Sequence, residues 1–238
     1  WIPGGIQTYI MMKYVEKFYP ETKFLGALKD FKILGIPFFK GYSAPKIGFN
    51  ESFSFIYEFG EHANNQQSDT LGREKLTKSN ELYTSPYHVG SGLFYLDQYL
   101  GKNILEEGLR EFSSRNGKDS FKTILENKSS KNLNWFFSDY ITDREAFDLH
   151  IKNTLKNKTT TSITISEKNG RKLPFKLDFI KNDSIVKEKW YFHSGNDSVY
   201  KLKRGEYDYV AINSNRYLPE KNRHNNWKYL KPSHGIKP

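Results

Sequence analysis

Six histidines are the side chains of this sequence best suited to bind a metal or to transfer protons. They are His62, His88, His150, His193, His224 and His234. A helical zinc site for hydrolysis needs two histidines four residues apart, with a glutamate between them as general base. No two of the six have that spacing. The segment 58–62 ends in Glu-His but has glutamate where the reversed motif needs its first histidine, which favours an exposed helix end.

The other common catalytic patterns are also missing. Cysteine is absent, so the sequence offers neither a thiol nucleophile nor a disulfide. It contains no Gly-x-Ser-x-Gly elbow and no phosphate-binding Gly-Lys-Ser/Thr loop. Ser91 stands between Gly90 and Gly92, but no base that would activate it can be identified, which favours a serine at a turn or helix start.

Composition and charge limit the class of partner. The 238 residues carry a net charge of +10, and 37% of them are hydrophobic, which is enough to form a core. The basic residues are spread along the whole chain and interleaved with 27 acidic ones, whereas a nucleic-acid-binding surface needs basic residues clustered on one face. We therefore expect a solvated surface and no specific nucleic-acid partner. No apolar run approaches the roughly 20 residues of a membrane span, so no transmembrane segment is predicted.

The candidate site residues lie in a sequence with two regions of different apolar periodicity, one helical and one typical of strands. From residue 1 to about 147, apolar residues recur at helical spacing. The first stripe, which Pro3 can open and Pro20 stops, consists of Ile6, Ile10, Tyr14 and Phe18. Further stripes lie at 93–100, 104–112, 121–125 and 135–141. A long irregular stretch is expected from Gly35 to about Pro86.

After Asp148 the period changes to two, which is typical of strands. Strands are predicted at 162–166, 175–179, 185–192, 199–202 and 207–212. Asn169-Gly170 is predicted to form a hairpin turn, and the tail from Pro219 to Pro238 is expected to be loop-like. The predicted fold class is α+β in two domains: an α-helical domain over 1–147 and a small β-sandwich with a polar tail over 148–238.

The first nine residues resemble a known family. Trp1-Ile2-Pro3-Gly4-Gly5-Ile6-Gln7-Thr8-Tyr9 is similar to Trp-Leu-Asn-Glu-Gly-Phe-Ala-x-Tyr of the M1 (gluzincin) zinc aminopeptidases. In that family the segment follows the His-Glu-x-x-His helix, and its glutamate is the third zinc ligand. Trp1, Gly5 and Tyr9 are in register, but Gly4 stands where the zinc-binding glutamate should be.

A second segment extends the resemblance. Tyr87-His88-Val89-Gly90 is similar to the family's Tyr-x-x-Gly, whose tyrosine donates a hydrogen bond to the oxyanion of the tetrahedral intermediate. The resemblance covers most of the chain and is best to the divergent, secreted-type bacterial branch. It implies that residues 1–147 are the C-terminal half of a thermolysin-like catalytic domain, followed by the family's small sandwich. It also implies a location in the cell envelope, in the periplasm or outside the cell.

The resemblance implies zinc in the parent protein and none in this chain alone. The chain opens on Trp1 rather than Met, so we expect it to be the C-terminal part of a longer metallopeptidase-like protein. Two zinc ligands would lie upstream, and Gly4 cannot supply the third, so this chain by itself is predicted to be inactive. In an active parent, a zinc-bound water would attack a peptide carbonyl and Tyr87 would act as the catalytic oxyanion donor.

Two other interpretations remain open. The parent can be a degenerate member, a pseudoenzyme that binds a peptide or protein without cleaving it. Alternatively, the chain can be a non-catalytic module that binds a peptide, a glycan or a polyanion. The singled-out residues also have structural interpretations: Tyr87 as a packed aromatic at a helix start, Tyr9 as part of the core and His88 as a structural histidine. The sequence does not predict an oligomeric state.

Overall fold

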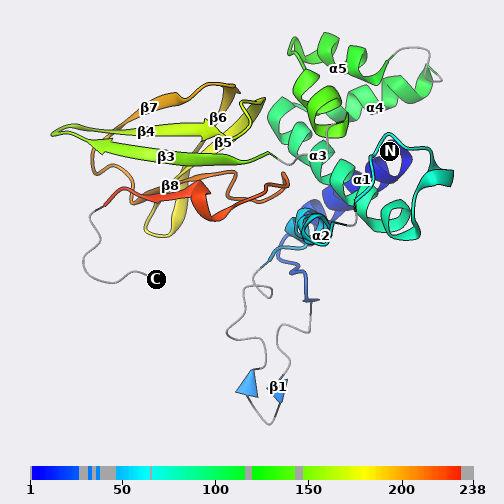
Figure 1. Cartoon of the computed structure of the whole chain (residues 1–238), viewed down its shortest axis with the longest axis horizontal. Helices are drawn as coiled ribbons and strands as arrows, with labels where there is room; N and C mark the ends of the chain where they lie inside the picture. Colours follow the sequence, from blue (N-terminus) through cyan, green and yellow to red (C-terminus); the bar gives the residue numbers. More distant parts are fainter. Residues whose placement is uncertain are drawn as a thin grey trace. The chain divides into compact units, whose positions relative to one another are not determined.

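The computed structural model describes residues 2–26, 32–33, 36–37, 47–64, 66–115, 120–142 and 147–231. The chain forms two compact units. Unit 1 comprises Trp1–Lys131, Tyr140–Arg144 and Arg216–Pro219, and unit 2 comprises Asn132–Asp139, Glu145–Asn215 and Glu220–Pro238. Helices dominate unit 1 and antiparallel strands dominate unit 2 (Figure 1). The predicted α+β fold class is therefore confirmed, while the domain boundary expected at residue 147 stays a prediction.

Unit 1 contains helices at the predicted apolar stripes other than that at 135–141, and one more, α2 (Glu51–His62), in the stretch that was expected to be irregular. The others are α1 (Ile2–Phe18), α3 (Ser85–Leu100), α4 (Ile104–Ser114) and α5 (Phe121–Ser129). The stripe predicted at 135–141 forms a π-helical segment, Trp135–Tyr140. A short 3-10 turn (Arg73–Lys75) and a π-helical turn (Asn80–Thr84) precede α3, and the strands β1 (Lys32–Ile33) and β2 (Ile36–Pro37) form a two-stranded pair. Helix α3 ends at Gly101, as predicted, because this glycine takes a left-handed φ of 65° that ordinary residues avoid.

The expected apolar stripe of α1 is not the face that the helix buries. Ile10, Tyr14 and Phe18 are 58%, 53% and 56% exposed. The buried face lies next to this stripe and includes Thr8, Tyr9 and Met12, so the prediction of Tyr9 as a core residue is confirmed. The apolar spacing selected the wrong side of the helix, because the buried face combines Tyr9 and Met12 with small residues such as Gly5.

Glycines set the contact between α1 and α3. A Cβ atom at Gly5 would overlap the side chain of Val89, and one at Gly90 would overlap the Cβ of Thr8. Each helix therefore offers a glycine where the other places a branched side chain, and the two backbones approach closely. This contact fixes the beginning of α1 against the beginning of α3.

The stretch from Gly35 to Pro86 is more regular than expected where the structure describes it. Helix α2 buries Phe53 and Tyr57, and the π-helical turn leads directly into α3. His62 lies at the exposed end of α2, which agrees with the interpretation of the Glu-His segment as a helix end. Residues 38–46 of this stretch lie outside the described residues.

Unit 2 is built from two antiparallel sheets. The first has the order β3 (Leu149–Lys156), β4 (Thr160–Glu167), β7 (Ser198–Lys203), and the second has the order β6 (Ser184–Ser194), β5 (Lys172–Lys181), β8 (Tyr209–Ile212), β9 (Trp227–Tyr229). Tyr200 of the first sheet contacts Phe175 and Tyr191 of the second, with ring centroids 6.0 and 4.5 Å apart. The predicted sandwich packing is therefore present.

Two local predictions in unit 2 are wrong. Asn169-Gly170 does not close a hairpin, because β4 pairs with β3 and β7 while β5 pairs with β6 and β8, so this turn carries the chain from one sheet to the other. The two-residue hairpin turn is Asn182-Asp183, with φ of 51° and 57°, between β5 and β6. The tail also contains β9, which pairs with β8.

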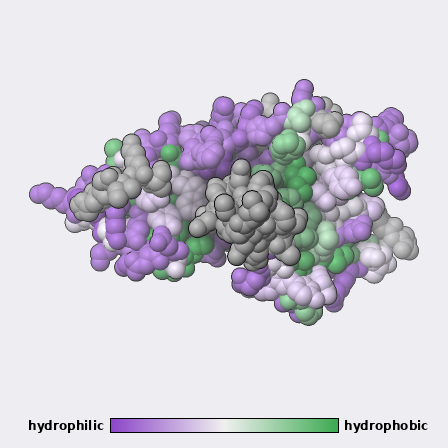
Figure 2. Space-filling model, turned by 90° about the horizontal axis from the view of Figure 1, so that it is seen from below, coloured by the Kyte–Doolittle hydropathy of each residue, from purple (hydrophilic) through white to green (hydrophobic). Residues whose placement is uncertain are grey.

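Polar residues dominate the face of the molecule in Figure 2, with hydrophobic areas between them. Exposed hydrophobic side chains of unit 1 include Met11, Tyr14 and Phe18 on α1 and Phe55 and Phe59 on α2. In the described part of the chain, no helix has both the length and the apolar character that crossing a membrane requires.

Candidate functional site

A hollow of about 670 Å³ lies in unit 1 between the first turns of α1, the segment 71–82 and the start of α3. Its volume is within the range of small-ligand sites. Both positions singled out by the sequence motifs, Gly4 and Tyr87, line it. Segments far apart in the sequence therefore meet at one concave surface.

The contact between α1 and α3 brings these two positions together. Pro86 occupies the first turn of α3, directly after the π-helical turn Asn80–Thr84. A Cβ atom at Gly4 would lie 3.0 Å from the Cγ of Pro86, which is a tight contact. Gly4 therefore lies directly beside the residue that precedes Tyr87.

Tyr87 is half-buried and held by other rings. Its ring lies edge-to-face against Phe53, with centroids 5.0 Å apart, and Tyr83 lies 6.0 Å away. Burial, and to a smaller extent Tyr83, raises the pKa of the Tyr87 phenol above its usual value. The hydroxyl is therefore protonated at neutral pH and makes no hydrogen bond to the described residues, so it can donate one to a ligand.

Two charged residues, Arg73 and Glu81, line the hollow, and the exposed Lys78 beside it also pairs with Glu81. Glu81 Oε1 accepts a hydrogen bond from Arg73 Nε at 2.5 Å, and Glu81 Oε2 accepts one from Lys78 Nζ at 2.7 Å. These two bonds, with that from Lys78 the larger influence, lower the pKa of the Glu81 carboxyl. Glu81 is therefore ionised, and each of its oxygens already has a cationic partner.

The described residues around the hollow do not fit a zinc ion. Gly4 has no side chain, no histidine lines the hollow, and the carboxylate there, that of Glu81, is held by two cations. Across the segments that the structure describes, no three His, Asp or Glu side chains stand together as metal ligands would.

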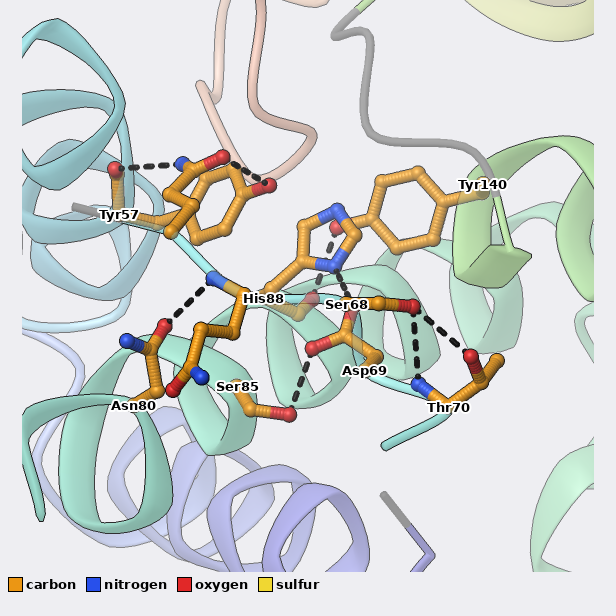
Figure 3. Close-up of polar contacts among 10 residues, drawn as sticks. Tyr57, Ser68, Asp69, Thr70, Asn80, Ser85, His88 and Tyr140 are labelled. Atoms are coloured by element: carbon orange, nitrogen blue, oxygen red, sulfur yellow. Dashed lines mark hydrogen bonds and ion pairs between the residues drawn. The ribbon is translucent and has the colours of Figure 1, made fainter. Parts of the chain in front are cut away.

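Behind the hollow, His88 forms a buried polar cluster with Asp69 and Ser85 (Figure 3). His88 Nδ1 donates to Asp69 Oδ2 at 2.5 Å, because a carboxylate can only accept, and Ser85 Oγ donates to Asp69 Oδ1 at 2.5 Å. The imidazole is stacked between the rings of Tyr57 and Tyr140, at centroid distances of 4.3 and 4.1 Å. The Tyr140 hydroxyl donates to the carbonyl of His88 at 2.7 Å.

This cluster is not a nucleophilic triad. In a serine hydrolase the serine hydroxyl donates to the imidazole, whereas Ser85 bonds the carboxylate of Asp69. His88 is 5% exposed and does not line the hollow. The packing supports the interpretation of His88 as a structural histidine.

The cluster positions one wall of the hollow. Asp69 belongs to the segment that continues to Leu71, Arg73 and Leu76, all of which line the hollow. The same segment is held at Gln67, whose N–H donates to Asn80 Oδ1 at 3.0 Å and whose Oε1 accepts from Thr77 N–H at 2.6 Å. Nothing in the sequence pointed to this arrangement, because Asp69 and His88 are not related by any helical or strand spacing.

Ser91 lies in the interior of α3, fully buried, so the expectation of a serine at a turn or helix start is wrong. Gly90 and Gly92, which suggested a turn, are in fact packing positions: a Cβ at Gly92 would overlap the ring of Tyr140. These glycines make room for neighbouring side chains, and Ser91 between them is 0% exposed and therefore out of reach of a substrate.

Comparison with known proteins leaves the family open. The sequence matches no protein-family model and none of the curated proteins. Among solved structures it is similar to Legionella pneumophila aminopeptidase A in complex with aspartic acid, with 16% sequence identity and a TM-score of 0.49. That similarity covers 58% of this chain and 18% of the aminopeptidase chain, so the chain spans less than a fifth of that protein.

Proposed function

We propose that unit 1 is the C-terminal part of an M1-like (gluzincin) metallopeptidase domain whose hollow binds peptides. We also propose that it is degenerate and does not cleave them, because Gly4 stands at the position of the zinc-ligand glutamate. The observation that carries the proposal is that Gly4 and Tyr87, taken from two separate motifs, line the same hollow. Zinc in the parent protein would need ligands outside the residues described around this hollow.

The lining suits a peptide. Met11, Leu71 and Leu82 give it apolar surface, on which a ligand side chain would lose contact with water. The protonated hydroxyl of Tyr87 is a hydrogen-bond donor for a backbone carbonyl. In an active relative the same donor would strengthen its bond as negative charge develops on that oxygen. In this chain we assign it to binding alone.

Replacing Tyr87 with phenylalanine should weaken peptide binding about fivefold. The change removes the hydroxyl while keeping the ring against Phe53, and a hydrogen bond of this kind contributes about 1 kcal/mol. Fluorescence polarisation with a set of labelled tetrapeptides measures the dissociation constants. Tyr14→Phe is the matched control, because Tyr14 lies on α1 outside the hollow. Equal loss in both variants, or no loss in Tyr87→Phe, would remove Tyr87 from the site.

Metal content tests the non-cleaving part of the proposal. Inductively coupled plasma mass spectrometry on the purified full-length parent is expected to find well below one zinc per chain. A content of about one zinc would mean that another residue supplies the missing ligand, and the protein would then have to be assayed as a peptidase.

The salt dependence of binding tests the alternative function. If peptide affinity falls steeply with salt in both wild type and Tyr87→Phe, a polyanion-binding module would be favoured instead.

A further inference from the structure

We infer that the hollow selects ligands that carry a carboxylate beside an apolar residue, and that Arg73 is the group that recognises the carboxylate. The inference rests on the proposed peptide-binding function of the hollow. It adds the charge that the ligand must carry and names the residue that determines it.

Glu81 is a poor binding partner for a positively charged ligand. Both of its oxygens accept hydrogen bonds from cations, Oε1 from Arg73 and Oε2 from Lys78. A ligand ammonium group would have to displace one of these partners. It would also approach two cations that share one carboxylate, so like charge opposes its binding.

Arg73, in contrast, can bind a negatively charged ligand. Glu81 holds its guanidinium through Nε, and no described residue bonds its two terminal nitrogens. A guanidinium held at one edge keeps a planar pair of N–H donors for a second carboxylate. The bond to Glu81 also restricts the side chain, so less conformational entropy is lost when a ligand binds.

The apolar part of the lining defines the rest of the ligand. Leu71 and Leu76 flank Arg73 in the sequence, and Leu82 follows Glu81, so apolar side chains stand beside the charged pair. A ligand that pairs with Arg73 would therefore place an apolar group against these leucines. The C-terminal carboxylate of a peptide whose last residue is apolar has this chemistry, as does an acidic side chain next to an apolar residue.

The expected selectivity is modest because the site is open. The side chain of Arg73 is 85% exposed, and exposed ion pairs are weakened by water and by salt. We therefore expect a peptide with a free C-terminal carboxylate to bind about three to five times more tightly than its C-terminal amide. Raising the ionic strength should reduce this ratio toward one.

The test compares three labelled peptides by fluorescence polarisation: an apolar tetrapeptide acid, its C-terminal amide, and an amide that carries one glutamate. Each is titrated against wild type, Arg73→Gln and the matched control Lys75→Gln. Lys75 lies in the same short turn and is exposed, but it does not line the hollow, so both variants lose one positive charge from the same region.

Wild type and Lys75→Gln should prefer the acid over the neutral amide, and Arg73→Gln should bind the two equally. Tight binding of the glutamate-containing amide would identify an acidic side chain as a further source of the carboxylate. If wild type binds acid and amide equally while Tyr87→Phe still weakens both, the inference fails and the peptide site stands. If wild type binds none of the peptides, the proposed function fails together with the inference.

Discussion

Replacing His88 with alanine should lower the free energy of unfolding by about 3–5 kcal/mol, the cost of removing a large buried ring. Two losses combine at this position. The space between the rings of Tyr57 and Tyr140 is left empty, and Asp69, which is 7% exposed, loses one of its two hydrogen-bond donors. Urea denaturation followed by far-ultraviolet circular dichroism measures the change, because the helical signal comes mainly from unit 1.

Two further variants make this result interpretable. His88→Asn retains an N–H donor near the position of Nδ1 and should recover part of the loss. His62→Ala changes the exposed histidine at the end of α2 and should alter the free energy of unfolding by no more than about 0.5 kcal/mol. If His88→Ala were as stable as His62→Ala, the buried cluster would contribute nothing to unit 1.

Replacing Gly90 with alanine should destabilise the protein by about 2 kcal/mol. The new methyl group would overlap the Cβ and Cγ2 of Thr8, and a Cβ cannot rotate away, so the helices must separate. Overpacking of this kind costs about 3 kcal/mol, and the better helix propensity of alanine returns about 1 kcal/mol. Because α1 and α3 carry both Gly4 and Tyr87, the variant should also weaken peptide binding.

Gly60 provides the matched control for this substitution. It also lies inside a helix, α2, but a Cβ atom at this position would have nothing within 4 Å. Gly60→Ala should therefore raise the free energy of unfolding by up to about 1 kcal/mol through helix propensity alone. Equal effects of the two substitutions would show that close approach of α1 and α3 is not required for stability.

The helices and strands that follow regular apolar periodicity could be predicted from the sequence. Helices α3 to α5 and strand β4 lie where the spacing of their apolar residues placed them. Strand β9 is only three residues long, which is too short for an alternating pattern to develop. The Asn169-Gly170 turn was assigned to the wrong connection, because the same residues favour any tight turn and carry no information about strand pairing.

The site was less accessible to prediction than the fold. The motifs identified Gly4 and Tyr87, and the structure places both at one hollow, although the catalytic role of Tyr87 stays a prediction. The buried face of α1 was missed because it combines Tyr9 and Met12 with Gly5 and Thr8, and neither glycine nor threonine adds to an apolar stripe. Asp69 was missed because its partner is set by tertiary packing alone.

The stacking of His88 between Tyr57 and Tyr140 also has a magnetic consequence. The carbon-bound protons of the imidazole lie near the faces of two phenol rings, whose circulating electrons oppose an applied field there. Their resonances are therefore displaced upfield from those of the exposed histidines such as His62. A single proton spectrum thus contains a signal that reports whether the wall of the hollow is in place, without any label or ligand.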